Sequence, residues 1–125
     1  MSNKLYVTWE DVSRYIDSVI GFLARTKKLE KVTGIYGIPR GGLVLAVMLS
    51  HRMNVPLLLA PCKDCIIIDD IADTGITLKH YDECGYFITT MFYHKQSIVT
   101  PKYWYFDKTN KWVVYPWEDT NVQSD

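Results

Sequence analysis

The segment Cys65–Thr77 (Cys-Ile-Ile-Ile-Asp-Asp-Ile-Ala-Asp-Thr-Gly-Ile-Thr) constrains the fold of this chain more than any other. Its first part, Cys65–Asp70, is a run of apolar residues that ends in two carboxylates. Such a run is typical of a β-strand that is covered on both faces. The loop Ile71–Gly75 then leads into a helix predicted over Ile76–Cys84, with Gly85 as its stop. A strand that passes through a short loop into a helix predicts an α/β unit.

The rest of the chain alternates helices and strands in the same manner. Helices are predicted over 9–26, after Thr8 as N-cap, and over Leu43–Met53. Strands are predicted over Val32–Tyr36, Val55–Ala60, Tyr86–Tyr93, Tyr103–Phe106 and Trp112–Tyr115. We therefore predict one α/β domain over residues 1–125, a mostly parallel twisted sheet flanked by helices, with a small C-terminal aromatic lobe.

The composition excludes several classes of protein. Of the 125 residues 48% are hydrophobic, so a core can form without disulfides or metals. The 14 basic and 14 acidic residues balance, whereas a nucleic-acid-binding protein usually has a basic excess. Neither a signal peptide nor a run of about 18 apolar residues is found, and an odd number of cysteines argues against a disulfide framework. We expect a cytoplasmic protein with neither a nucleic-acid nor a membrane partner.

The loop between the strand and the helix has the groups that a phosphorylated ligand needs. Open α/β sheets bind ligands at the carboxyl ends of their strands, and a helix N-terminus attracts a phosphate. Thr74 and Thr77 add hydroxyl donors, and Gly75 permits close approach of the backbone. Asp69 and Asp70 suit either ribose hydroxyls or Mg²⁺. Because adjacent carboxylates repel each other, we expect a cation or a ligand beside them.

This segment resembles the motif with which type I phosphoribosyltransferases bind phosphoribosyl pyrophosphate (PRPP). The wider chain resembles their xanthine-guanine and hypoxanthine branch. The resemblance implies that Asp69 and Asp70 hold the ribose hydroxyls and, with substrate oxygens, Mg²⁺. Asp73 matches the carboxylate that the family places near purine N7, as a general acid/base or a hydrogen-bond partner. The 5′-phosphate would be held by Ala72, Asp73, Thr74, Gly75, Ile76 and Thr77.

A second glycine-rich turn, Gly37–Gly42 (Gly-Ile-Pro-Arg-Gly-Gly), follows a predicted strand and precedes a helix. It has neither the Gly-Lys-Ser/Thr of a Walker loop nor the Gly-x-Gly-x-x-Gly spacing of a dinucleotide site. Arg40 could pair with a phosphate in the bidentate manner of guanidinium groups, although taken alone the turn is more typical of a structural connection. The resemblance makes it the pyrophosphate loop, with Arg40 and Gly41 as contacts.

Three further residues match the purine-binding positions of this family. Lys95 lies just after the predicted strand Tyr86–Tyr93, where the family has a lysine that donates to purine O6, whereas a lone lysine there is usually a solvated charge. Trp112 matches an aromatic residue that stacks on the purine, although packing over the core is an alternative. Val113 matches the residue whose backbone bonds the edge of the base.

The connection between two predicted strands is unusually short. Only Pro61–Asp64 joins Val55–Ala60 to Cys65–Asp70, whereas parallel neighbours need about a dozen connecting residues. The two segments must therefore form an antiparallel hairpin, or the first is not a core strand. The family has a long flexible hood here, and it is missing. The cysteines of Cys62-Lys-Asp-Cys65 lack a second pair that would complete a zinc site, and we favour ordinary strand-end residues over a redox pair.

The residues and the resemblance together predict a purine phosphoribosyltransferase. It would transfer the phosphoribosyl group of PRPP to guanine, xanthine or hypoxanthine and release pyrophosphate, with Mg²⁺ as cofactor. A homodimer or homotetramer is expected because relatives usually form one. The alternative is a non-catalytic or weakly catalytic regulatory protein that binds PRPP or a nucleotide and has lost the hood. The complete set of purine-binding positions favours the enzyme, and the missing hood favours the regulator.

Overall fold

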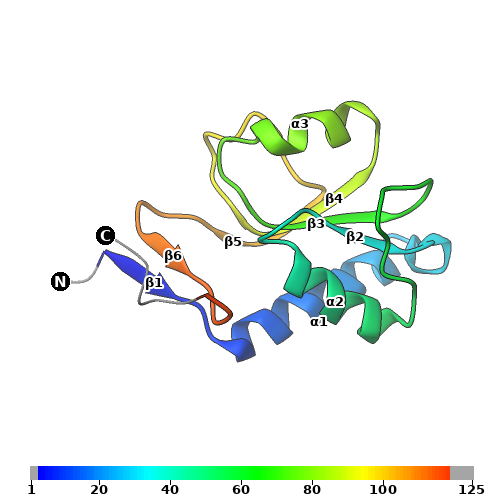
Figure 1. Cartoon of the computed structure of the whole chain (residues 1–125), viewed down its shortest axis with the longest axis horizontal. Helices are drawn as coiled ribbons and strands as arrows, with labels where there is room; N and C mark the ends of the chain where they lie inside the picture. The colour runs from blue at the N-terminus through cyan, green and yellow to red at the C-terminus, as the bar shows by residue number, and fades with distance from the viewer. Residues whose placement is uncertain (1–2, 119–125) are drawn as a thin grey trace.

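A four-stranded parallel sheet forms the centre of the molecule (Figure 1). A computed structural model describes residues 3–118 of the chain. The strand order in the sheet is β2-β3-β4-β5, and every neighbouring pair is parallel. The strands are β2 (Ile35–Gly37), β3 (Ile66–Ala72), β4 (Phe87–Tyr93) and β5 (Tyr103–Asp107). The predicted α/β fold class is thereby confirmed.

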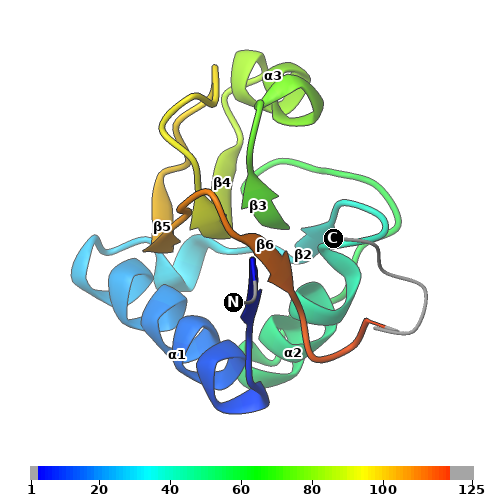
Figure 2. The same ribbon diagram turned by 90° about the vertical axis from the view of Figure 1, so that its left-hand side faces the viewer.

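Helices cover both faces of this sheet. Helices α1 (Trp9–Arg25) and α2 (Leu43–Met53) lie against one face, and α3 (Ile76–Glu83) lies over the other (Figure 2). A short 3₁₀ helix, η1 (Leu29–Lys31), follows α1. No helix among residues 3–118 has both the length and the apolar character that crossing a membrane requires.

A second, smaller sheet lies beyond the carboxyl ends of the four strands (Figures 1 and 2). It consists of β1 (Lys4–Tyr6) and β6 (Trp112–Val114), which pair in parallel. The ring of Trp117 stacks on Tyr115 at 5.0 Å and also contacts Trp9 at 6.0 Å. These aromatic contacts form the predicted C-terminal lobe, whereas β1 is a strand that the sequence analysis missed.

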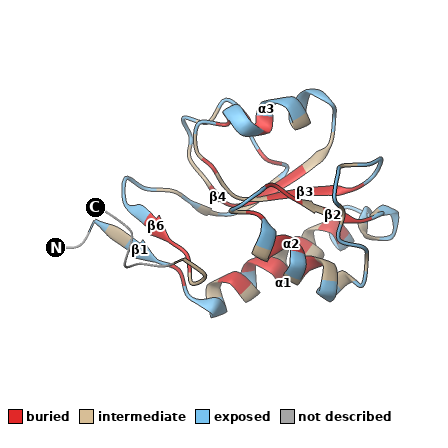
Figure 3. Cartoon of the chain, viewed as in Figure 1, coloured by how far each residue is buried: buried red, intermediate tan, exposed pale blue. Residues whose placement is uncertain are grey.

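The apolar run of β3 is explained by burial on both sides of the sheet (Figure 3). Ile66 and Ile68 pack into the cluster formed with α1 and α2, whereas Ile67 packs into the smaller cluster on the α3 side. All three side chains are at most 2% exposed. Because successive side chains of a strand point to opposite faces, only an uninterrupted apolar run satisfies both clusters.

The start of α1 follows the predicted capping pattern. The hydroxyl of Thr8 accepts the N–H of Asp11 at 3.0 Å, and the carboxylate of Asp11 accepts the N–H of Thr8 at 2.9 Å. This reciprocal pair satisfies two backbone donors at the helix end. The buried face of α1 consists of Val12, Tyr15, Ile16, Val19 and Leu23.

The predicted strand Val55–Ala60 is wrong, because only Leu57 forms a bridge, which is parallel and joins it to Ile35. The N–H of Ile35 donates to the carbonyl of Pro56 at 2.9 Å, and the N–H of Leu58 donates to the carbonyl of Ile35 at 2.8 Å. Since Ile35 also pairs with Ile66 of β3, the bridge lies on the opposite edge of β2. The segment is therefore not a core strand, and the hairpin alternative is excluded.

The predicted strand Val32–Tyr36 also needs correction, because β2 begins only at Ile35. Val32 is instead the C-cap of η1, and its N–H donates to the carbonyl of Leu29. Of the two β-branched residues that suggested a longer strand, Val32 closes this turn, and the N–H of Thr33 donates to the carbonyl of Asp64.

Candidate active site

Two carboxylates side by side on β3 form the centre of the site. Asp69 and Asp70 are the fourth and fifth residues of the strand, and the Oδ1 atom of Asp69 accepts the N–H of Asp70 at 2.9 Å. Burial raises the pKa of Asp69 to about 8, with the neighbouring carboxylate of Asp70 as the second cause. Burial also raises the pKa of Asp70. Within residues 3–118, neither carboxylate forms an ion pair with a basic side chain, so the pair suits a cation or hydroxyl donors.

The turn that precedes α2 packs directly against this acidic pair. A Cβ atom on Gly41 would lie 2.3 Å from Oδ2 of Asp70, and one on Gly42 would lie 2.3 Å from the carbonyl oxygen of Ile68. Only glycine therefore fits at these positions without displacement. Of the predicted pyrophosphate residues, Gly41 lies against Asp70, and Arg40, the residue before it, is exposed.

The loop from β3 to α3 forms the second part of the site. Gly75 has φ +84°, and a Cβ there would lie 2.5 Å from the hydroxyl of Ser97. The carbonyl of Thr74 accepts the N–H of Ile98 at 2.8 Å, so the loop is anchored on the segment after β4. The N-cap Gly75 has no side chain to cap α3, and Oγ1 of Thr74 accepts the N–H of Ile76 at 3.3 Å, so the N-terminus of the helix faces the loop. A hollow of about 210 Å³ is lined here by Asp69, Asp70, Ile71, Asp73, Thr74, Gly75, Thr77 and Leu78.

Asp73 is held by three side chains that the sequence analysis did not identify. Its Oδ1 atom accepts from Nε2 of Gln96 at 3.0 Å and lies 3.1 Å from Nδ1 of His94. Its Oδ2 atom lies 3.6 Å from Nζ of Lys108. Gln96 and His94 follow β4, and Lys108 follows β5. Their convergence depends on the strand order, for which the sequence has no local signal.

Lys95 is exposed on the same loop after β4. It borders a hollow of about 580 Å³, which is also lined by Tyr93, His94, Asp107, Lys108, Thr109 and Asn110. Since His94 and Lys108 line this hollow and contact Asp73, the predicted base-binding lysine and the predicted catalytic carboxylate share one neighbourhood.

Trp112 and Val113 belong to β6, in the smaller sheet. The N–H of Trp112 donates to Asn3, and the carbonyl of Val114 accepts the N–H of Val7 at 2.8 Å. Because peptide groups alternate in direction along a strand, the N–H and C=O of Val113 point to the side of β6 opposite β1. The side chain of Trp112 is 52% exposed, whereas that of Val113 is buried. This arrangement suits a planar ligand that contacts the ring of Trp112 and hydrogen-bonds to the backbone of Val113.

Tyr115 connects the small sheet to the acidic pair, a role that the sequence analysis did not anticipate. Its hydroxyl donates to the carbonyl of Asp70 at 3.3 Å, and its N–H donates to the carboxylate of Glu118 at 2.9 Å. Burial raises the pKa of Tyr115 far above its usual value, and the nearby carboxylates of Asp70 and Asp69 add to this effect. The tyrosine therefore stays neutral and remains a donor.

Solved structures resemble the chain over nearly its whole length, although no family model matches it. A purine phosphoribosyltransferase from Pyrococcus horikoshii is 30% identical with a TM-score of 0.78, over 98% of this chain and 99% of that one. The chain belongs to the type I phosphoribosyltransferase family. It is accordingly a transferase by family.

Two more distant structures share the fold of this phosphoribosyltransferase. A xanthine-guanine-hypoxanthine phosphoribosyltransferase from Helicobacter pylori is 14% identical with a TM-score of 0.73, over 95% of this chain and 96% of that one. A hypothetical protein from Neisseria gonorrhoeae with bound ppGpp is also 14% identical, with a TM-score of 0.71 over 98% of this chain and 93% of that one. At this identity the two likenesses show a shared fold, which is the α/β fold that the sequence resemblance implied.

Proposed function

We propose that this phosphoribosyltransferase uses PRPP and Mg²⁺ to convert a 6-oxopurine base into its nucleoside 5′-monophosphate. The observation that carries the proposal is the half-buried acidic pair of Asp69 and Asp70, which lies between a glycine turn and a loop that feeds into a helix N-terminus. Each of these three elements suits one part of PRPP: the ribose hydroxyls, the pyrophosphate and the 5′-phosphate. A cytoplasmic, homo-oligomeric enzyme is part of the same proposal.

The acidic pair fits Mg²⁺ as well as ribose. Its donors are carboxylate oxygens, which Mg²⁺ prefers. A cation there would offset the burial and the repulsion by Asp70 that together raise the pKa of Asp69. Among the described residues no third acidic, histidine or cysteine side chain completes a metal cluster, so substrate oxygens and water would supply the remaining ligands. When bound, Mg²⁺ would offset the charge of the pyrophosphate leaving group.

The reaction would be a displacement at C1′ of the ribose. A ring nitrogen of the purine forms the new bond as the C1′–oxygen bond to pyrophosphate breaks, and the base loses one proton. Arg40 would bind the departing pyrophosphate, and the N-terminus of α3 would hold the 5′-phosphate. Asp73, oriented by Gln96 and His94, would hold or accept the purine proton at N7. The chain thus mainly positions the reactants and stabilises charge.

The choice of base would rest on Lys95 and β6. An ammonium group only donates hydrogen bonds, so it fits the O6 acceptor of guanine, xanthine or hypoxanthine and does not fit the amino group of adenine. Trp112 would stack on the purine, and the outward peptide groups of Val113 would bond its edge.

The direct test is incubation with PRPP, Mg²⁺ and each of guanine, xanthine, hypoxanthine and adenine, followed by chromatography of the nucleotides. Formation of GMP, XMP or IMP with stoichiometric pyrophosphate is expected, and little AMP. Formation of AMP without any GMP, XMP or IMP would contradict the assignment to 6-oxopurines.

A regulatory protein that binds PRPP or a nucleotide is the second candidate. The short connection between Leu58 and Ile66 favours it, because little chain is present to close over the pyrophosphate. The similar fold of the Neisseria protein with bound ppGpp is consistent with nucleotide binding on such a scaffold. If no base is converted while GMP binds in calorimetry, this candidate replaces the enzyme.

A further inference from the structure

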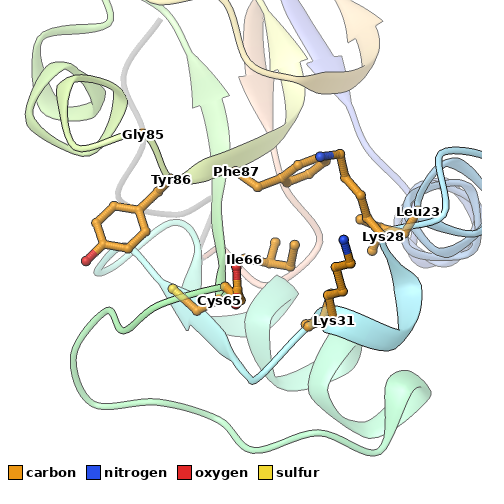
Figure 4. Close-up of a pocket in the computed structure, with 10 residues that line it drawn as sticks. Leu23, Lys28, Lys31, Cys65, Ile66, Gly85, Tyr86 and Phe87 are labelled. Atoms are coloured by element: carbon orange, nitrogen blue, oxygen red, sulfur yellow. The ribbon is translucent and has the colours of Figure 1, made fainter.

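Two cysteines lie at the end of the sheet opposite the acidic pair. Cys65 immediately precedes β3, and its side chain lines a hollow of about 180 Å³ beside Lys31 and Tyr86 (Figure 4). Cys65 is 2% exposed, whereas Cys62 is exposed, and both are free thiols. Sequence spacing alone favoured ordinary strand-end residues here, but the fold adds geometry that the spacing does not contain.

The segment from Cys62 to Cys65 is a tight turn. The N–H of Cys65 donates to the carbonyl of Cys62 at 3.2 Å, and Asp64 has φ +63°. A turn closed by this bond brings its first and last Cα atoms within about 7 Å, which overlaps the range of about 4.4–6.8 Å found across disulfides. Burial raises the pKa of Cys65, and the nearby thiol of Cys62 adds to this rise.

Thr33 holds the turn in place from the neighbouring segment. Its hydroxyl donates to the carbonyl of Lys63 at 2.7 Å, and the same oxygen lies 3.6 Å from Sγ of Cys62. The N–H of Thr33 donates to the carbonyl of Asp64 at 3.1 Å. Because the hydroxyl hydrogen is directed at Lys63, the thiol of Cys62 is the donor to Thr33. The backbone of the turn and the thiol of Cys62 are thus held in place before any reaction.

We propose that Cys62 and Cys65 form a reversible dithiol–disulfide couple, a redox modification site at the base of β3. With glutathione disulfide as oxidant, the exposed thiolate of Cys62 attacks one sulfur, and glutathione leaves as the first thiol. Cys65 then loses its proton and attacks Sγ of Cys62, which releases the second glutathione. The balance is one dithiol and one glutathione disulfide giving one protein disulfide and two glutathione molecules.

The order of attack follows from burial. Cys62 is accessible to an oxidant, whereas the buried Cys65 has a raised pKa and is available only to a neighbour that the turn brings close. The third cysteine, Cys84, lies at the C-terminus of α3, where its sulfur is 3.9 Å from Nε2 of His80. It therefore serves as an internal reference thiol.

The test equilibrates the whole chain in glutathione buffers of increasing oxidised fraction, quenches with acid, alkylates the free thiols and maps the peptides by mass spectrometry. We expect a single transition in which Cys62 and Cys65 lose alkylation together and Cys84 keeps it. The midpoint should not change with protein concentration, and dithiothreitol should restore all three thiols. The measurement requires neither PRPP nor a base, so its outcome is independent of the proposed function.

Matched variants decide between this couple and unspecific oxidation. Cys84→Ser should leave the transition unchanged, whereas Cys62→Ser, at an exposed position, should abolish it while circular dichroism shows an intact fold. Cys65→Ala should convert Cys62 into a stable mixed disulfide with glutathione. Mixed disulfide at Cys62 in the unmodified sequence, disulfide-linked dimers, or no loss of alkylation at the two cysteines would each overturn the proposal.

Discussion

The backbone of Gly41 lies directly against the carboxylate of Asp70, at a distance that leaves no room for a side chain. A Cβ atom at Gly41 would be 2.3 Å from Oδ2 and 2.6 Å from Oδ1 of Asp70. The contact joins the turn before α2 to the acidic pair on β3, so that any group bound by one is also near the other.

Gly41→Ala should therefore disrupt ligand binding more than folding. The added methyl group must displace the carboxylate of Asp70 or the turn itself, because the two atoms cannot approach so closely. We expect the affinity for PRPP with Mg²⁺ to fall by at least roughly ten-fold in calorimetry, about 1.4 kcal/mol. Gly21→Ala in α1 is the matched control, since a Cβ there meets only the end of the flexible Arg25 side chain. Unchanged affinity in Gly41→Ala would place the ligand elsewhere.

The pair of carboxylates should make the ligand-free protein less stable as the pH rises. The pKa of Asp69 is about 8 in the folded chain, whereas an unperturbed aspartate has a pKa of 3.8. Between pH 3.8 and pH 8 the folded state therefore holds a proton that the unfolded state has released. The free energy of unfolding then falls with increasing pH, by about 1.4 kcal/mol for each unit of pKa separation. Urea unfolding at pH 5 and pH 8 measures this loss.

Asp69→Asn provides the control for that pH dependence. The variant has no group to titrate at this position, so its free energy of unfolding should decline less between pH 5 and pH 8. The difference in stability in favour of the variant should be largest at pH 8. Asp82→Asn, at an exposed position on α3, should keep the parent slope. Equal slopes in the parent and in Asp69→Asn would show that the pKa of Asp69 is not raised.

Asp70→Asn should weaken PRPP binding in the presence of Mg²⁺ and leave the fold intact. Loss of a charge-assisted hydrogen bond costs on the order of 1.5–3 kcal/mol, or roughly ten- to hundred-fold in affinity. Calorimetry with and without Mg²⁺ separates the two roles of the carboxylate: if it serves the metal, most of the loss appears only with Mg²⁺ present. An unchanged affinity in both titrations would refute the assignment of Asp70.

The sequence predicted the local parts of this site and missed those that depend on the order of the strands. The acidic pair, Gly75 and the helix after it are contiguous, so one apolar run followed by a loop was enough to find them. Gln96 and Lys108 contact Asp73 only because β3, β4 and β5 follow one another in the sheet. Tyr115 reaches Asp70 from the second sheet, across 45 positions of the chain. No local sequence pattern predicts contacts of this kind.

The error at Val55–Ala60 has a physical reason as well. Its apolar residues satisfy a strand pattern, yet only Leu57 pairs with β2, and Leu59 is fully exposed. Parallel neighbours need about a dozen connecting residues, so the sequence correctly excluded that this segment pairs in parallel with β3. The same rule could not show that the segment lies on the other edge of β2.

Lys95→Met should remove the discrimination between bases that differ at position 6. The ammonium group donates to an O6 acceptor, and methionine has no donor to replace it. We expect kcat/KM for guanine and hypoxanthine to fall by about ten- to hundred-fold while the trace activity with adenine stays the same. Lys102→Met, another exposed lysine, is the control and should retain the parent preference. Efficient use of adenine by the parent protein would show that Lys95 does not occupy that place.

The short connection between Leu58 and Ile66 should allow water to react with PRPP in place of the base. A closing loop expels water from an active site and completes contacts to the leaving group, and this chain has little to close with. We expect slow turnover and measurable hydrolysis of PRPP to ribose 5-phosphate, whereas the affinity for a nucleoside monophosphate, which needs no such cover, should be retained. Single-turnover kinetics with radiolabelled PRPP measures both products.

A neighbouring subunit is the one source of cover that would change this outcome. In that case the transfer rate should fall, and hydrolysis should rise, as the protein is diluted to monomer, which analytical ultracentrifugation monitors in parallel. A fast chemical step that is independent of protein concentration and free of ribose 5-phosphate would contradict the expectation, because the short connection would then suffice to exclude water. No transfer with any base, together with intact binding of nucleoside monophosphate, would instead favour the regulatory protein.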